Sequence, residues 1–339
     1  MMAKPWMKRL GRILGYFLLG LQVLLAVAIT FTIGWRPFVG PKSRPLTSRK
    51  FESTRERLAR GQYLADAVLA CFACHSAFDE KSDPPAITSK KGIGRVFLEK
   101  GKFRIVAPNI TPDPTAGVGN WSDDALARAI REGITQDGSA LFPIMGYPHF
   151  RNLSDEDLAS VVVNLRSLEP VHNSLPKSVL PFWLQRAVLG EPQPITAPVP
   201  EPDLSNPVKR GEYLVRIAGC EDCHTPEKGM PPRPVPGLAF GGGTVFGGVA
   251  SANITPDPSG ISYYDEALFI EVMRTGSVKA RPIKLPMPWP VYKNMNDDDL
   301  KAVFAYLRTR KPVHHLVDNT EPPTLCKLCG QKHGFGDRN

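Results

Sequence analysis

Apolar residues follow two different spacings along this chain of 339 residues, and each spacing predicts a different element. Residues 13–35 form a run without a charged side chain, and about 20 apolar residues are enough to cross a bilayer as a helix. Two later stripes instead recur every three or four positions, which is typical of one buried face of a helix. These stripes consist of Leu158, Val161, Val162, Leu165 and Leu168, and of Leu300, Val303, Phe304 and Leu307.

Polar residues mark where the predicted helices begin and end. Ser154 and Asn296 each precede three acidic residues and one of the two stripes, so we predict that both are helix N-caps. Ser122 is likewise predicted to cap a helix that Gly133 ends. The capping pattern therefore predicts helices after all three residues.

Strand signals are few in this sequence. Residues 102–107 and 244–250 are β-prone, and each is expected to contribute to a small hairpin. The segments around Gly61 and Gly211 are expected to lead helically into two pairs of cysteines. The pattern as a whole predicts a mainly α protein.

Each of these cysteine pairs opens a C-x-x-C-H motif, the covalent attachment site of a c-type haem. Two intervening residues place both sulfurs within one helical turn, where they can form thioethers with one porphyrin, and the histidine then becomes the proximal iron ligand. C-x-x-C alone also occurs in redox dithiols and zinc sites, but two motifs in similar surroundings favour haem. We predict two covalently bound haem c groups. The residues are Cys71, Cys74 and His75 in the first motif, and Cys220, Cys223 and His224 in the second.

A longer internal repeat surrounds the two motifs. Arg-Gly-x-Tyr-Leu begins at Arg60 and again at Arg210, and Asn-Ile-Thr-Pro-Asp-Pro begins at Asn109 and again at Asn253. Each copy is long enough for one small domain. We therefore expect two tandem haem domains.

The prolines between the two copies predict a connector. Proline favours an extended chain, so residues 191–202 are either a semi-rigid spacer or a loop packed across both domains. The apolar residues just before this stretch favour the packed loop. The predicted segments are a cytoplasmic N-terminus with a transmembrane signal anchor (1–36), haem domain one (51–175), the proline-rich connector (176–206), haem domain two (207–316) and a cysteine-containing tail (317–339).

A methionine in each copy is the candidate for the sixth iron ligand. Met145 and Met287 align without a gap to the last predicted helix, and prolines nearby would stiffen their loops. A thioether ligand raises the reduction potential relative to two imidazoles. Methionine also fills irregular gaps in a core, but its equivalent position in both copies favours ligation. The remaining histidines are weaker candidates for iron, namely His149, His172, His314 and His315.

The order of these motifs resembles the cytochrome c subunits of bacterial membrane-bound alcohol and gluconate dehydrogenases, and related diheme cytochromes c. The likeness covers about residues 55–316 and includes Gly-x-Tyr-Leu, C-x-x-C-H, Asn-Ile-Thr-Pro-Asp, Trp-Ser, Met-Pro-aromatic and a final Asp-Asp-Leu helix. It implies class I cytochrome c domains that carry electrons from a periplasmic dehydrogenase toward quinone or a terminal acceptor. It also implies the axial pairs His75 with Met145 and His224 with Met287.

Three features depart from the subunits that the sequence resembles. Those subunits usually carry three haem motifs, and this chain has two. Asn164 stands where Tyr306 lies in the second copy, so an aromatic contact between the first and last helices is expected to be missing from domain one. Gly146 replaces the proline that follows the ligand methionine, and we expect a looser loop there.

These departures keep a second interpretation open beside electron transfer. A diheme enzyme, peroxidase-like or oxidising sulfur compounds, would need one iron with an accessible distal face. Domain one, with its altered loop, is the better candidate for such an open site. We favour an electron-transfer protein or the cytochrome subunit of an oxidoreductase complex.

Positive charge is concentrated at the N-terminus of the chain. Nine of the 42 Lys and Arg residues, and no acidic residue, precede residue 51, which leaves 33 basic against 33 acidic residues. The formal net charge of +9 therefore indicates a membrane-flanking segment and not a nucleic-acid-binding surface.

The apolar run with its basic flank predicts a single-pass anchor in the inner membrane. Lys4, Lys8, Arg9 and Arg12 precede the run. The alternative is a cleaved signal peptide, because residues 26–28 form an A-x-A site, but the apolar run continues beyond it. Because the resemblance implies haem attachment outside the cytoplasm, we expect the haem domains in the periplasm. Expected partners are a dehydrogenase, a terminal oxidase or a soluble cytochrome.

A third cysteine pair lies in the tail, at Cys326 and Cys329. Gly330 stands where a haem-binding histidine would follow, which disfavours a third haem. A disulfide across so short a gap forms a strained ring. Zinc with His333 would still need a fourth ligand. The sequence leaves these two alternatives open.

Overall fold

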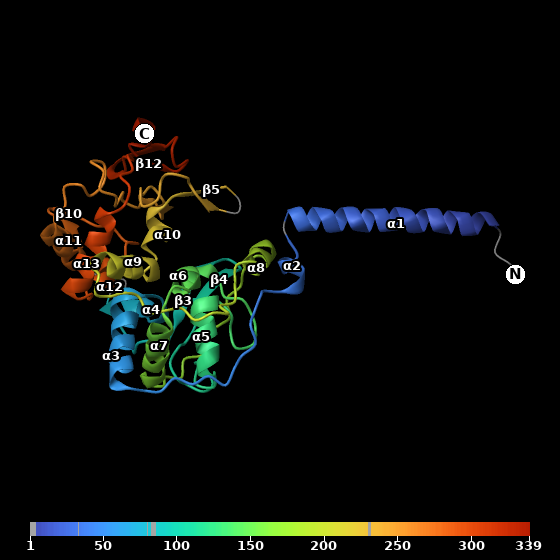
Figure 1. The fold of residues 1–339 in the computed structure, drawn as a ribbon, viewed down its shortest axis with the longest axis horizontal. Helices are drawn as coiled ribbons and strands as arrows, with labels where there is room; N and C mark the ends of the chain where they lie inside the picture. The colour runs from blue at the N-terminus through green and yellow to red at the C-terminus, as the bar shows by residue number, and fades with distance from the viewer. Residues whose placement is uncertain (1–4, 33, 80, 83–85, 230–231) are drawn as a thin grey trace.

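The computed structural model describes residues 5–32, 34–79, 81–82, 86–229 and 232–339 as a helical protein with a separate N-terminal helix (Figure 1). This helix, α1 (Pro5–Phe31), extends away from the remaining elements. The segment Arg9–Phe31 is long and apolar enough to cross a membrane, and none of it is buried. The predicted apolar helix is therefore confirmed, while Lys4 of its basic flank lies outside the described residues.

Two helices packed on each other form the frame of the first repeat (residues 51–175). They are α3 (Arg55–Tyr63) and α7 (Asp155–Ser167). The other elements, in chain order, are the π-helix η1 (Leu64–Val68), α4 (Cys71–His75), β1 (Phe78–Asp79), β2 (Ala86–Ile87), β3 (Arg95–Lys100), β4 (Phe103–Ala107), α5 (Asp123–Glu132), η2 (Pro143–Met145) and α6 (Tyr147–Phe150).

The second repeat (residues 207–316) is framed in the same way by α9 (Pro207–Ile217) and α13 (Asp297–Arg308). Its other elements are α10 (Cys220–His224), β5 (Glu227–Lys228), β6 (Arg233–Pro234), β7 (Val245–Phe246), β8 (Val249–Ala250), α11 (Glu266–Thr275), β9 (Ser277–Val278), β10 (Arg281–Pro282) and α12 (Trp289–Tyr292). Outside the repeats lie α2 (Arg36–Val39), α8 (Phe182–Val188), β11 (Asp318–Leu325), β12 (Lys332–Gly334) and η3 (Gly336–Arg338).

Helix caps form where the sequence predicts them. The side chains of Ser122, Ser154 and Asn296 each accept a hydrogen bond from the backbone N–H three residues later. Helix α5 ends at Gly133, whose φ of 71° is left-handed. Both hairpins also form, but the first is longer than predicted, because residues 102–107 pair with the unpredicted strand β3.

A glycine allows the two framing helices of each repeat to pack closely. A Cβ atom added at Gly61 would lie 1.9 Å from the carbonyl oxygen of Ser160, and one added at Gly211 would lie 1.9 Å from that of Ala302. No side chain fits into such a contact between backbones. This approach explains why glycine occurs in the same place of both Arg-Gly-x-Tyr-Leu motifs.

The first repeat has one more residue than the second between this motif and its cysteines. The extra residue is accommodated in η1, because a π-helical turn holds one residue more than an α-helical turn. The chain then turns into the C-x-x-C-H helix through a left-handed residue, Ala70 (φ 53°) in the first repeat and Gly219 (φ 68°) in the second. The two motifs thus start from the same backbone geometry.

The two repeats meet through reciprocal hydrogen bonds between equivalent residues. Tyr63 of the first repeat donates its hydroxyl to Asp299 of the second at 2.5 Å, and Tyr213 of the second donates to Asp157 of the first at 2.7 Å. Such an exchange between like residues is the arrangement of a two-fold interface between identical subunits. Buried apolar residues from both repeats also form one continuous cluster.

The connector packs against the first repeat, as one half of the predicted packing across both domains. The backbone N–H of Asp155 donates to the carbonyl of Val199, and Arg104 exchanges backbone hydrogen bonds with Val179. The apolar residues before the prolines nevertheless remain exposed, because Phe182 and Trp183 on α8 are 71% and 65% accessible. Packing on the first repeat therefore does not explain why residues 182 and 183 are aromatic.

We expect Gly211→Ala to destabilise the second repeat by about 3 kcal/mol, because the added methyl group must push α9 away from α13. Urea denaturation followed by circular dichroism measures this change. Gly190→Ala is the matched control, since its added Cβ makes only an ordinary contact at 3.5 Å. Equal stability of the two variants would contradict the close helix crossing.

Candidate haem sites

Both predicted cysteine–histidine motifs lie on short helices that begin directly after the left-handed turns. Helix α4 carries Cys71, Cys74 and His75, and α10 carries the equivalent residues of the second repeat. The cysteines at the start of the two helices, Cys71 and Cys220, pack against the central apolar cluster. Met145 and Met287 pack against the same cluster. The structure therefore brings the leading cysteine of each motif and the two predicted methionine ligands to one shared core.

The two histidines of the motifs are held in the same way. His75 Nδ1 lies 2.7 Å from the carbonyl oxygen of Pro108, and His224 Nδ1 lies 2.7 Å from that of Ala252. A hydrogen bond from Nδ1–H fixes the ring and leaves Nε2 as the free lone pair. Desolvation by burial lowers the pKa of both imidazoles, so the neutral, metal-binding form is favoured at neutral pH.

The repeated Asn-Ile-Thr sequence positions the carbonyl groups that hold these histidines. Asn109 follows Pro108 directly, and its side-chain oxygen accepts hydrogen bonds from the backbone and hydroxyl of Thr111 at 2.9 and 2.7 Å. Its side-chain nitrogen donates to the carbonyl of Val171, beyond the last helix, at 2.7 Å. The loop thereby ties the end of the repeat to its histidine. The equivalent residues in the second repeat are Ala252, Asn253, Thr255 and Val313.

A cavity of about 310 Å³ lies beside the second motif. Its lining includes Cys220, Cys223, His224 and Met287, so all four predicted ligating residues of this repeat face one space. The rest of the lining is mainly apolar and includes Leu214 and other buried side chains. Two thiols, an imidazole with a free Nε2 and a thioether around an apolar space fit a covalently held haem.

The leading thiols are poorly suited to redox exchange on their own. Desolvation, together with the neighbouring cysteine of each pair, raises the pKa of Cys71 and of Cys220 to about 12. A thiol reacts as a dithiol redox centre through its thiolate, which such a pKa disfavours at neutral pH. This chemistry is in keeping with attachment residues and disfavours a thioredoxin-like role.

Gly146 is closely packed in the loop around Met145. Its φ of 82° is left-handed, and a Cβ atom added there would lie 2.7 Å from Nε2 of His149. Glycine therefore allows the imidazole of His149 to pack against this loop, where proline could not be placed. In the second repeat Met287 lies two residues before Trp289, whose ring covers Gly276.

His149 joins the two sites, a role that the sequence did not predict. Its Nδ1 lies 2.7 Å from a carboxylate oxygen of Asp222, inside the second C-x-x-C-H motif. A Cβ atom added at Gly219 would come within 2.8 Å of the same ring. His149 thus bridges the Met145 loop and the second motif. The only signal of this role in the sequence was that His149 has no counterpart in the second repeat, where Val291 occupies the equivalent position.

The other histidines differ in their surroundings. His172 and His314 are exposed at equivalent positions, beside the carboxylates of Asp113 and Asp257. His315 is instead fully buried, with an exposed fraction of 0%. His172 and His314 thus lie at the protein surface, whereas His315 lies in the interior.

The first repeat lacks the aromatic side chain that the second repeat has at this place of its last helix. Tyr306 on α13 packs edge-on against Phe240, which lies in the loop before β7 and not on α9, with ring centroids 6.4 Å apart. Asn164 occupies the equivalent place and is buried, and its side-chain nitrogen has no hydrogen-bond partner among the described residues. The first repeat is consequently more polar than the second where its framing helices cross at Gly61.

No family model matches the chain. It is 31% identical over 275 residues, 76% of its length, to the cytochrome c subunit of alcohol dehydrogenase (quinone) from Gluconobacter oxydans, and it covers 55% of that subunit. It is 31% identical over 284 residues, 79% of its length, to the fructose dehydrogenase cytochrome subunit of Gluconobacter japonicus, again covering 55%. It is 29% identical over 243 residues, 70% of its length, to a diheme cytochrome c-type protein of Cereibacter sphaeroides, covering 81%.

The homologues at about 30% identity are thus cytochrome c subunits of dehydrogenases and a diheme cytochrome c. This relationship supports an electron-transfer cytochrome and implies covalently bound haem c. The chain spans just over half the length of the first two relatives.

We expect Asn253→Ala to destabilise the protein by about 1–3 kcal/mol, because it leaves the carbonyl of Val313 and the backbone N–H of Thr255 without their buried partner. Equilibrium denaturation measures the loss. Asn294→Ala, at an exposed asparagine, should change stability by less than about 0.5 kcal/mol. A loss of similar size in both variants would refute a special role for the Asn-Ile-Thr loop.

Proposed function

We propose that this chain, a homologue of cytochrome c subunits of bacterial dehydrogenases, is a membrane-tethered diheme c-type cytochrome that transfers electrons between a respiratory donor and a downstream acceptor. The observation that carries the proposal is that Cys220, Cys223, His224 and Met287 line one apolar cavity, while Cys71 and Met145, their equivalents in the first repeat, pack against the same core as Cys220 and Met287. When bound, haem c supplies a one-electron redox centre.

In this proposal each repeat is a class I cytochrome c domain, in which cysteine, histidine and methionine side chains have different roles in binding haem. Cys71 and Cys74, and in the second repeat Cys220 and Cys223, form the thioethers. The buried imidazoles of His75 and His224 present Nε2 to the iron, since Nδ1 is bonded to a carbonyl oxygen. Met145 and Met287 would supply the other iron ligand of each haem.

The contact between the repeats supports exchange of electrons within the chain. The reciprocal Tyr–Asp hydrogen bonds hold the repeats in a fixed orientation, and His149 lies between the Met145 loop and the second motif. An apolar core shared by both repeats excludes water from the space between them. We therefore propose that the two sites act as one relay.

Side chains near the base of α1 support attachment to a membrane. Helix α2, which follows α1, contacts α8, and Figure 1 shows both helices beside the end of α1. Trp35, Phe38, Phe182 and Trp183 are exposed on this part of the protein. Tryptophan, here Trp35 and Trp183, is enriched where proteins meet the membrane–water interface. We propose that α1 is retained as an anchor in the inner membrane, with both repeats in the periplasm.

A dehydrogenase is the proposed electron donor. The relatives named above are subunits of alcohol and fructose dehydrogenases, and a further relative is a gluconate 2-dehydrogenase cytochrome c subunit. A terminal oxidase or a soluble cytochrome would accept the electrons. Purification of the full chain in mild detergent should therefore retain a redox-active subunit that reduces the haems when its substrate is added. Haems that are reduced by chemical reductants but not when a dehydrogenase substrate is added would contradict a dehydrogenase as the electron donor.

We expect Met145→Ala and Met287→Ala each to convert one of two low-spin ferric haems to high spin and to remove about half of the methionine–iron charge-transfer absorption. Electron paramagnetic resonance and absorption spectra measure both effects. Met295→Leu is the control, because Met295 is a buried core residue and leucine conserves its volume.

The same spectra separate electron transfer from the alternative of an enzyme with an open first site. A relay requires two low-spin haems in the unaltered protein. A high-spin haem that is already present there, and that Met145→Ala leaves unchanged, would instead favour the enzyme.

A further inference from the structure

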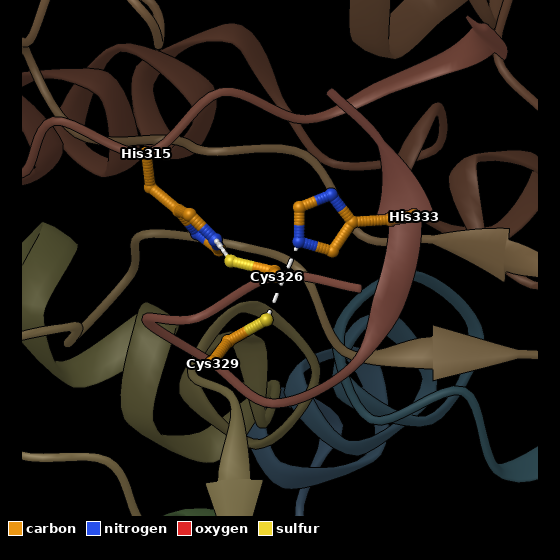
Figure 2. A group of neighbouring side chains, drawn as sticks. All are labelled: His315, Cys326, Cys329 and His333. Carbon is orange, nitrogen blue, oxygen red and sulfur yellow. Dashed lines mark hydrogen bonds between the residues drawn. The ribbon is translucent and has the colours of Figure 1, made fainter. Parts of the chain in front are cut away.

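Four metal-binding side chains converge where the C-terminal tail folds back on the second repeat. Figure 2 shows His315, Cys326, Cys329 and His333 pointing toward one another, and their ligand atoms all lie within 4.8 Å of one another. All four residues are buried, with exposed fractions between 0% and 2%. The third cysteine pair thus lies beside two histidines. His333 is in the tail, whereas His315 precedes it.

The spacing of the four ligand atoms matches a small tetrahedron. His315 Nε2 lies 3.4 Å from Cys326 Sγ, and His333 Nε2 lies 3.3 Å from Cys329 Sγ. Zinc bonds of about 2.3 Å to sulfur and about 2.0 Å to nitrogen place such atoms about 3.5 Å apart at tetrahedral angles. A single ion can therefore contact all four atoms after only small movements.

Hydrogen bonds behind the ligands orient them toward this point. His315 Nδ1 lies 2.9 Å from the carbonyl oxygen of Gly241, and His333 Nδ1 lies 3.0 Å from that of Gly334. Both imidazoles therefore direct Nε2 at the sulfurs, as metal-binding histidines with a carbonyl partner do. The backbone N–H of Gln331 points at Cys329 Sγ at 3.4 Å, which stabilises a thiolate.

We propose that His315, Cys326, Cys329 and His333 bind one structural zinc ion. Two thiolates and two imidazoles in a tetrahedral arrangement select zinc among the common metals. The protein fills all four positions, which is typical of a structural site and not of a catalytic one. A disulfide between the cysteines would leave two buried imidazoles aimed at sulfurs that no longer bind them. The proposal does not depend on the haem assignment.

The zinc ion would hold the tail in place on the second repeat. There the tail forms part of the wall of the second cavity. Asn319 on β11 exchanges two hydrogen bonds with the backbone of Ala250, and it lines the same cavity as Met287. On the other side of the cysteine turn, Lys228 donates to the carbonyl of Leu328 at 2.6 Å. Zinc joins this tail to His315, which lies at the end of the second repeat. The first repeat has no histidine there, since Asn173 takes that position.

Metal analysis of the full chain, purified in detergent with its haems, tests the proposal. Inductively coupled plasma mass spectrometry should find one zinc per chain, independently of how much iron is present. The zinc X-ray absorption spectrum should show two sulfurs at about 2.3 Å and two nitrogens at about 2.0 Å. Cys326→Ser and His315→Ala should each lower the zinc content at least tenfold.

His314→Ala is the matched control, because this neighbouring histidine is exposed and should leave one zinc per chain. Absence of zinc from the unaltered protein, a Cys326–Cys329 disulfide, another metal in its place or zinc bound without sulfur would each overturn the proposal. Retention of zinc in Cys326→Ser would do the same. If that variant does not fold, the zinc content and absorption spectrum of the unaltered chain decide alone. Loss of zinc with both haems retained would separate this site from the electron-transfer function.

Discussion

The arrangement of the two repeats depends on a pair of buried carboxylates. Asp157 and Asp299 are almost inaccessible to solvent, and each accepts hydrogen bonds from an arginine of its own repeat and a tyrosine of the other. Loss of the tyrosine hydroxyl from such a buried carboxylate costs about 1.5–3 kcal/mol, because the arginine remains but one charge-assisted hydrogen bond is lost. The orientation that satisfies both carboxylates at once is therefore strongly preferred. It places the second cysteine motif beside His149 and the Met145 loop, so the same contact that orders the fold determines how the two sites face each other.

Departures from this internal symmetry distinguish the two sites chemically. The first repeat accommodates an extra residue in a π-helical turn and places the buried amide of Asn164 where the second has the ring of Tyr306. The second repeat alone carries the tail, whose Asn319 lines its cavity. Haem potentials respond to polarity, hydrogen bonding and burial around the iron. The different surroundings of the two proposed sites would therefore give them different reduction potentials.

Local features of the fold could be predicted from the sequence, and long-range contacts could not. Ser122, Ser154 and Asn296 cap helices through bonds to residues three positions away, so a short stretch of sequence contains the whole signal. The partner strand of residues 102–107 and the packing of His149 over Gly146 depend on backbone conformation that residue types alone do not determine. Tyr63 and Asp299 are far apart in the chain, and nothing in either neighbourhood identifies the other. His315 was missed as a zinc ligand because its alignment partner, Asn173, has no comparable role.

The central claim is that the two haem sites of one chain exchange electrons, and a flash-reduction experiment tests it most directly. In Met287→Ala the second site should absorb differently from the first, so the two can be followed separately after fewer than one electron per chain is delivered. The account predicts a redistribution of the electron between the two signals at a rate independent of protein concentration. Redistribution that slows in proportion to dilution, or that does not occur, would contradict a relay within the chain.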